Sequence, residues 1–297
     1  VDASATDSAG VASLVVSGGL SGFTDTDASV GRVQGSWTLP MVLVDGPITV
    51  TFRSCDVVGN CGTATGTVII DRTPPVITTT VTFLNTGMMT PATPLGASRI
   101  VAGALTVVAT ATDDAGLAST TVTRMGTPLM PITGNTVSRF QGTYLTTSQT
   151  DGALQLIANA CDTVGNCADS TLNLVVDNTA PTIAVQSPPS PSPFYSVSVP
   201  VEATASDANG SLVTAGVTSL IINGWNGFAD QDAAPARIFG AWTIVPQQSD
   251  GQTPSVLVAC DGVGNCSPAN QLVANIDRTP PQVTITTAPP QYTNAST

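Results

Sequence analysis

The 297-residue chain contains no histidine and no lysine, and its only basic side chains are eight arginines. Without histidine it can form neither a Ser-His-Asp triad nor a His-ligated zinc site, and without lysine it can form no Schiff base. It also has no run of 18 apolar residues, so the sequence predicts no membrane-spanning helix. We therefore expect the protein not to be an enzyme and not to span a membrane by a helix.

The charge of the chain is strongly one-sided. Aspartate and glutamate together number 20 and the formal net charge is −12. An acidic surface is repelled by nucleic acid and by anionic lipid headgroups, so we expect neither as a partner. Divalent cations and basic partners remain compatible with this composition, and so does a plain acidic surface that keeps the protein soluble.

Two short motifs recur three times. A turn motif, Cys-Asp-x-Val-Gly-Asn-Cys, is followed by an apolar run and then by an exit motif, Asp-x-Thr-x-Pro, at residues 71–75, 177–181 and 277–281. A period of about 100 residues indicates tandem domains, because solenoid repeats are much shorter. We predict an incomplete unit lacking its first strand, two complete units, and a segment that supplies the first strand of a following unit or a donor strand for the next chain; these are residues 1–72, 73–178, 179–278 and 279–297.

The six cysteines occur only in the turn motif. Even pairing at one fixed spacing indicates disulfides and hence an oxidising compartment. A metal site is the alternative, but two thiols with no histidine and no third thiol nearby make a poor zinc site. We therefore expect an extracellular or cell-surface protein with the bridges Cys55–Cys61, Cys161–Cys167 and Cys260–Cys266.

Strand signals dominate each unit. Before the second turn motif, Leu154, Leu156, Ala158 and Ala160 alternate with more polar residues, which is typical of a strand with one buried face. Glycine, asparagine and aspartate inside the turn motif favour a hairpin turn. About seven strands in about 100 residues fit a Greek-key sandwich. The predicted fold is all-β: tandem immunoglobulin-like Greek-key β-sandwiches arranged as a rod.

A third element, Ala-x-Ala-x-Asp at residues 3–7, 109–113 and 203–207, completes the repeat pattern. With the Asp-x-x-Gly-Asn turn and the exit motif, it makes the chain resemble the bacterial immunoglobulin-like tandem repeats of large secreted and surface proteins. That resemblance implies stalks, adhesin spacers and surface arrays. The paired cysteines depart from the plain pattern and are expected to fix the hairpin.

Several aspartates are candidate calcium ligands. In such a sandwich the second and sixth strands run parallel, so Asp113, Asp114 and Asp162 should lie near one pole, which Asp71 also approaches. The same arrangement predicts a second set, made of Asp177, Asp207 and Asp261. Carboxylate oxygens suit calcium. The alternative is that these aspartates cap turns, as aspartate commonly does.

The two ends of the chain match one another in the repeat. Residues 281–285 correspond to residues 181–185, which the first unit lacks, and Val1 corresponds to Val201. We expect Val283, Ile285 and Tyr292 to join the unit that begins at Val1, so that copies of the chain meet head to tail. Two accounts remain open: one longer covalent array, or strand donation between separate chains.

These features predict a structural repeat segment of an extracellular filament, stalk or cell-surface array. The alternative is an adhesin that binds a surface glycan or protein through variable loops around residues 25–27 and 230–232. Those acidic loops are expected to be solvated turns or weak cation sites. No cofactor other than calcium is expected.

Overall fold

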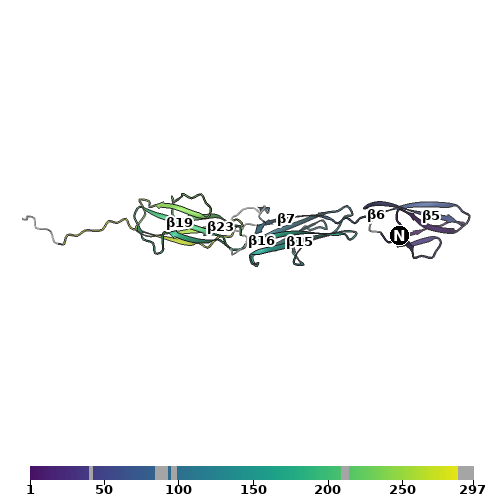
Figure 1. Cartoon of the computed structure of the whole chain (residues 1–297), viewed down its shortest axis with the longest axis horizontal. Coiled ribbons are helices and arrows are strands. Elements are labelled where there is room, and N and C mark those ends of the chain that lie inside the picture. The colour runs from purple at the N-terminus through teal and green to yellow at the C-terminus, as the bar shows by residue number, and fades with distance from the viewer. Residues whose placement is uncertain (40–42, 84–92, 95–98, 209–213, 287–297) are drawn as a thin grey trace, which may run out of the picture. The chain divides into compact units, whose positions relative to one another are not determined.

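The computed structural model describes residues 1–39, 43–83, 93–94, 99–208 and 214–286. Within these ranges every regular element is a β-strand, which confirms the expected all-β fold (Figure 1). The described part of the chain forms no helix that is long and apolar enough to cross a membrane. The strands form pairs of sheets, which we call the first, second and third sandwich in chain order.

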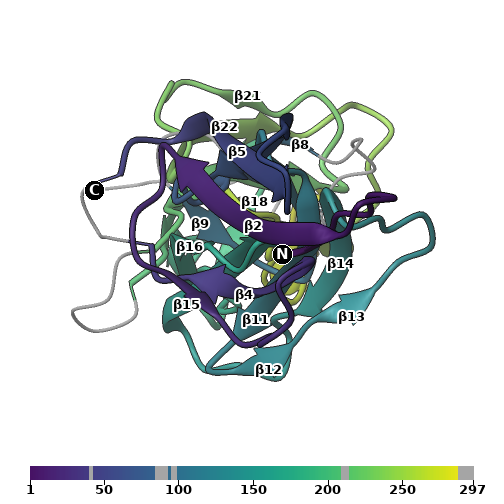
Figure 2. The same cartoon turned by 90° about the vertical axis from the view of Figure 1, so that its right-hand side faces the viewer.

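The first sandwich has two three-stranded sheets, with the orders β1-β4-β3 and β2-β5-β6. Strands β2 and β4, one from each sheet, are labelled in Figure 2. The bounds are β1 (Asp2–Ser4), β2 (Val11–Gly18), β3 (Phe23–Asp25), β4 (Arg32–Trp37), β5 (Gly46–Asp56) and β6 (Cys61–Ile70).

The second sandwich has two five-stranded sheets, with the orders β13-β14-β10-β7-β8 and β12-β11-β15-β16-β9. Strand β9 runs parallel to β16, whereas β11 pairs antiparallel with β12 and with β15, and β7 pairs antiparallel with β8. The bounds are β7 (Val76–Phe83), β8 (Thr93–Pro94), β9 (Ile100–Val101), β10 (Ala104–Thr112), β11 (Leu117–Arg124), β12 (Thr127–Pro128), β13 (Met130–Pro131), β14 (Arg139–Leu145), β15 (Gly152–Asp162) and β16 (Cys167–Val176).

The third sandwich has two four-stranded sheets, with the orders β17-β19-β22-β21 and β18-β24-β23-β20. Strand β18 runs parallel to β24, as β9 does to β16 in the second sandwich. The bounds are β17 (Thr182–Ser187), β18 (Phe194–Tyr195), β19 (Ser198–Ser206), β20 (Val217–Asn223), β21 (Ala229–Asp230), β22 (Arg237–Thr243), β23 (Gly251–Asp261) and β24 (Asn270–Ile276).

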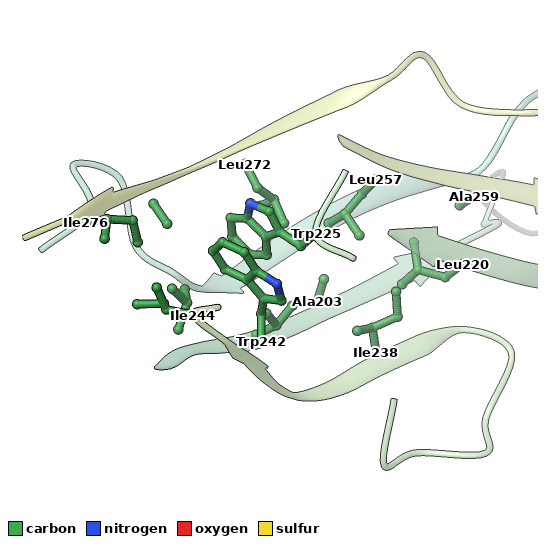
Figure 3. Close-up of a cluster of buried hydrophobic side chains, with 13 residues drawn as sticks. Ala203, Leu220, Trp225, Ile238, Trp242, Ile244, Leu257, Ala259, Leu272 and Ile276 are labelled. Atoms are coloured by element: carbon green, nitrogen blue, oxygen red, sulfur yellow. The ribbon is translucent and has the colours of Figure 1, made fainter. Parts of the chain in front are cut away.

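Alternating burial along the strands builds the core of each sandwich. In β15, Leu154, Leu156, Ala158 and Ala160 are all at most 3% exposed, as their spacing predicts. In the third sandwich the rings of Trp225 and Trp242 stack nearly parallel, with centroids 5.1 Å apart and an interplanar angle of 9° (Figure 3). Such offset pairing adds to the apolar area that the rings bury.

By their internal contacts the residues fall into two compact units. The first comprises residues 1–79, 108–141 and 157–171, and the second comprises residues 80–107, 142–156 and 172–297. Each of the two expected aspartate sets lies wholly inside one unit, so each can be described by itself. The domain boundaries that the repeat predicts remain a prediction.

Candidate functional site

The aspartate of the turn motif organises the hairpin that carries it. In the second sandwich the Oδ1 atom of Asp162 accepts hydrogen bonds from the backbone N–H groups of Val164, Gly165 and Asn166, at 2.9, 2.6 and 2.9 Å. The Nδ2 group of Asn166 donates to Oδ2 of Asp162 at 2.6 Å. Gly165 adopts φ +104°, a left-handed conformation that favours glycine. The expected turn-capping role of this aspartate is therefore real.

The asparagine of the turn motif also reaches the preceding exit motif. Nδ2 of Asn166 donates to the backbone carbonyl of Asp71 at 3.2 Å, and Nδ2 of Asn265 donates to that of Asp177 at 2.8 Å. In the first sandwich Nδ2 of the corresponding Asn60 donates to Oδ2 of Asp56 at 2.9 Å. Within the described ranges this Nδ2 group makes no other hydrogen bond. In the second and the third sandwich, therefore, the asparagine of the turn motif is hydrogen-bonded to the preceding exit motif.

Three further aspartates, which the sequence analysis did not identify, also bind the exit motifs. Asp151 accepts from the backbone N–H of Asn178 at 2.7 Å and from the Thr179 hydroxyl at 2.5 Å. Asp45 and Asp250 hold the other two exit motifs in the same way. A sequence signal was present, because each of the three precedes a glycine and they recur with the same spacing as the cysteines. We call these aspartate bonds to an exit motif the exit clamp. The exit clamp and the hydrogen bond from the turn-motif asparagine to the same exit motif together form what we call a joint.

Each joint gathers three carboxylates. One carboxylate oxygen from each of Asp71, Asp113 and Asp162 lies within 4.8 Å of the others, and Asp177, Asp207 and Asp261 form an equivalent set. The structure thus brings together six of the seven aspartates that the sequence analysis named for calcium. Asp114 lies outside the first set but lines the same cavity of about 790 Å³ as Asp71 and Asp113.

The electrostatic setting differs within these sets. Burial acts to raise the pKa of Asp162, but the hydrogen bonds from Asn166, Gly165 and Val164 outweigh it and hold that pKa below its usual value. Burial raises the pKa of Asp177, and the charges of Asp207 and Asp261 raise it further. Burial and the charge of Asp261 also raise the pKa of Asp207. The second set therefore holds carboxylates whose charges are poorly compensated by the protein.

One oxygen in each set has no hydrogen-bond partner in the described part of the chain. These atoms are Oδ2 of Asp71 and Oδ2 of Asp207, and both are buried. By contrast, Asp177 accepts from the backbone N–H groups of Ala215 and Thr179. Closely spaced carboxylate oxygens with free lone pairs are suitable ligands for a hard divalent cation.

The acidic loops around residues 25–27 and 230–232 are closed by internal bonds. Oδ1 of Asp230 accepts from the backbone N–H groups of Asp232 and Phe239, at 3.0 Å each. Arg237 then pairs with Asp232 at 2.7 Å and with Glu202 at 2.8 Å. The loop in the first sandwich repeats this pattern through Asp25, Asp27, Asp2 and Arg32. These aspartates therefore serve as turn caps and as partners of an arginine.

All three expected disulfides are confirmed. Cys55–Cys61 and Cys161–Cys167 join neighbouring strands across the turn motif, and Cys260–Cys266 joins β23 to an isolated bridge residue after the turn; the Cα atoms of each pair are 4.1 Å apart. Each bridge closes the turn motif, whose asparagine comes directly before the second cysteine. They therefore fix the loop that forms each joint.

The residues expected to join copies are exposed where the structure describes them. Val283 is 88% exposed, Ile285 is 72% exposed and Val1 is 46% exposed. Tyr292 lies outside the described residues. Residues 281–286 form no strand.

No family model and no curated protein matches the chain. Among solved structures, the fibronectin(III)-like modules of Clostridium thermocellum CbhA match with 17% identity over 63% of this chain and 93% of that one, with a TM-score of 0.34. An ICAM-5 ectodomain fragment matches with 15% identity over 93% and 71%, with a TM-score of 0.34. The Bacteroides ovatus surface protein SGBP-B, solved with a mixed-linkage heptasaccharide, matches with 12% identity over 93% and 64%, with a TM-score of 0.20. At these values the likeness does not extend to function.

Proposed function

We propose that the chain is a structural repeat segment of an extracellular filament, stalk or cell-surface array, in which immunoglobulin-like units are joined head to tail. The observation that supports this proposal is the joint, which occurs twice and is formed by the same residue types at equivalent positions of the repeat. In each copy an asparagine side chain bonds the exit backbone of the preceding motif, and an aspartate clamp holds the adjacent threonine. A repeated contact of this kind is suited to fixing the spacing and alignment of successive units.

The proposal includes a cation at each joint. Calcium would neutralise three carboxylates whose oxygens lie within 4.8 Å of one another, and it would use the buried Oδ2 atoms of Asp71 and Asp207. Bound calcium at 100 times its dissociation constant would add about 2.7 kcal/mol to the free energy of unfolding. The joint would then be tightest in the calcium-containing medium outside cells.

The calcium proposal is tested by thermal unfolding of the whole chain with calcium, with magnesium and with a chelator. We expect calcium to raise the unfolding temperature and Asp207→Asn to remove the part of the shift that arises in the second set. Because Asp207 is repelled by Asp261, this variant should be at least as stable as the native chain in the chelator. Asp230→Asn, in an acidic loop outside the joints, is the matched control. An unchanged calcium response in Asp207→Asn would remove this part of the proposal.

The scaffold proposal is tested by imaging native material captured with antibodies against the third sandwich. Continuous fibres or stalks with a regular repeat are expected. Dispersed molecules that carry a bound glycan would favour the adhesin, in which the loops around residues 25–27 and 230–232 meet a ligand. A glycan array probed with the purified chain separates the two, since the scaffold requires no glycan binding.

The proposal assigns no catalytic role to the chain. The two carboxyl groups with raised pKa, Asp177 and Asp207, lie at a joint and in the same carboxylate set as Asp261. That placement fits cation binding better than proton transfer to a substrate. The resemblance to bacterial surface repeats and the three disulfides support an extracellular location.

A further inference from the structure

One of the three disulfides has a cation beside it. Nη2 of Arg53 donates a hydrogen bond to Sγ of Cys61 at 3.0 Å. Arg53 is exposed, and within the described residues its guanidinium forms no ion pair. Strands β2, β5 and β6, which form the sheet around this bridge, contain one other charged residue, Asp56, whose carboxylate accepts hydrogen bonds from the turn. Cys61 therefore has an uncompensated guanidinium in direct contact with its sulfur.

The other two bridges have no cation at this position. Two residues before the first cysteine of the turn motif the chain has Arg53, Asn159 and Val258, and two residues after the second cysteine it has Thr63, Asp169 and Pro268. In the second sandwich Asn159 donates to the carboxylate of Asp169 at 2.8 Å, so an anion takes the place of the cation. The third bridge has apolar residues at both positions, and both its cysteines are half-buried. The aspartate of the turn motif is common to all three bridges and does not distinguish them.

We propose that the Cys55–Cys61 bridge is a thiol-exchange site that reacts with a low-molecular-weight thiol. The incoming thiol loses its proton to water and attacks Sγ of Cys55 as a thiolate. A new S–S bond forms at Cys55 while the original S–S bond breaks, and the electron pair of the broken bond leaves with Cys61 as a thiolate. The guanidinium of Arg53 stabilises that thiolate, and a better stabilised thiolate leaves faster. The product is a mixed disulfide at Cys55.

The burial of the two sulfurs favours a small thiol over a protein thiol. Cys61 is exposed, whereas Cys55, the cysteine that is attacked, is half-buried in the central strand of its sheet, between Ser13 and Cys61. Exchange depends on access to the attacked sulfur, and a small compound reaches it more easily. Cys167 is exposed as well, in a turn motif that is bonded to a preceding exit motif, so exposure is shared. The contact with Arg53 is what sets the first bridge apart.

Reduction kinetics of each bridge in the whole chain test this inference. The chain is incubated with excess dithiothreitol, samples are quenched with acid at intervals, and the free thiols are alkylated and assigned by peptide mass spectrometry. We expect the first bridge to open about tenfold faster than the other two, because its leaving thiolate is stabilised by charge. In about 1 M sodium chloride, where the Debye length is about 3 Å, the difference between the first and second bridges should shrink. A parallel reaction with reduced glutathione should place glutathione on Cys55 and the alkyl label on Cys61.

Charge-changing variants separate the effect of Arg53 from simple access. Arg53→Gln should slow the first bridge to about the rate of the second, whereas Arg139→Gln, which removes an arginine outside the turn motifs, should leave all three rates unchanged. Asn159→Arg combined with Asp169→Thr gives the second bridge the flanking residues of the first and should speed its opening about tenfold. Circular dichroism checks that each variant remains folded. A first bridge that stays fast in Arg53→Gln, three equal rates in the native chain, or glutathione on Cys61 would overturn the inference.

Discussion

The asparagine of the turn motif provides the sharpest test of the joint. Asn265→Ala removes two hydrogen bonds, one to the Asp261 carboxylate at 2.6 Å and one to the Asp177 carbonyl at 2.8 Å. A bond to a charged group contributes about 1.5–3 kcal/mol and a neutral bond about 0.5–1.5 kcal/mol. We therefore expect the free energy of unfolding of the third sandwich to fall by about 2–4 kcal/mol.

Asn60→Ala is the internal control, because Asn60 has the same place in the first turn motif. It loses the bond to Asp56 but no joint bond recorded in the described ranges, and it is exposed. The loss should therefore be smaller than at Asn265 by roughly the value of the neutral bond and its burial, about 1 kcal/mol or more.

Tryptophan fluorescence during urea unfolding can measure this effect in the third sandwich alone. Trp225 and Trp242 are both 3% exposed there, and a Trp37→Phe background removes the signal of the first sandwich. A local reporter is needed because a multidomain chain does not unfold in one step. A loss of about 3 kcal/mol should lower the urea midpoint by about 1–3 M. Equal destabilisation by Asn265→Ala in this background, and by Asn60→Ala in a chain that keeps Trp37 and carries Trp225→Phe and Trp242→Phe, would refute the contribution of the joint bond.

Three further outcomes are expected. Replacing both Cys161 and Cys167 by serine should destabilise the second sandwich by about 2 kcal/mol, the chain-entropy value for a loop of about seven residues, as measured by hydrogen exchange of β15 and β16; an unchanged exchange rate would contradict this. Gly240→Ala should displace β21, because the added Cβ would lie 2.6 Å from a backbone carbonyl, and exchange of the β21 amides should rise while β24 is unaffected; native protection in β21 would be the contrary result. The Thr279 hydroxyl and the Arg278 backbone N–H lower the pKa of Asp250, so its clamp should contribute stability above pH ~4 and lose it as the pH falls below that value, a dependence that Asp250→Asn should abolish.

The repeat pattern predicted much of the fold because strand alternation and hairpin turns are local signals. The apolar parity of β15 and all three disulfides could be read from the sequence. The aspartate sets were also predictable, since the sandwich topology brings the starts of particular turns to one pole.

The joint bonds were not predictable, since their partners lie far apart in the chain. Asparagine is suited to positive φ, yet among the residues of the three turn motifs only the glycines adopt it. The asparagine contributes its side-chain amide instead, to a carbonyl 88 residues away. The clamp aspartates, such as Asp151, were visible as a recurring Asp-Gly pair, but nothing local pairs them with a threonine 28 residues later.

Hydrogen exchange of the whole chain at pH 7 tests the joint most directly. The account predicts protected amides at Asn178 and along residues 182–187, where the exit motif is both clamped and followed by a docked strand. It predicts protection at the clamped Arg278 but exchange at the unstructured-peptide rate along residues 281–286 of a dilute chain. Exchange at Asn178 and Arg278 as fast as along residues 281–286 would show that the exits are flexible linkers, which contradicts the account.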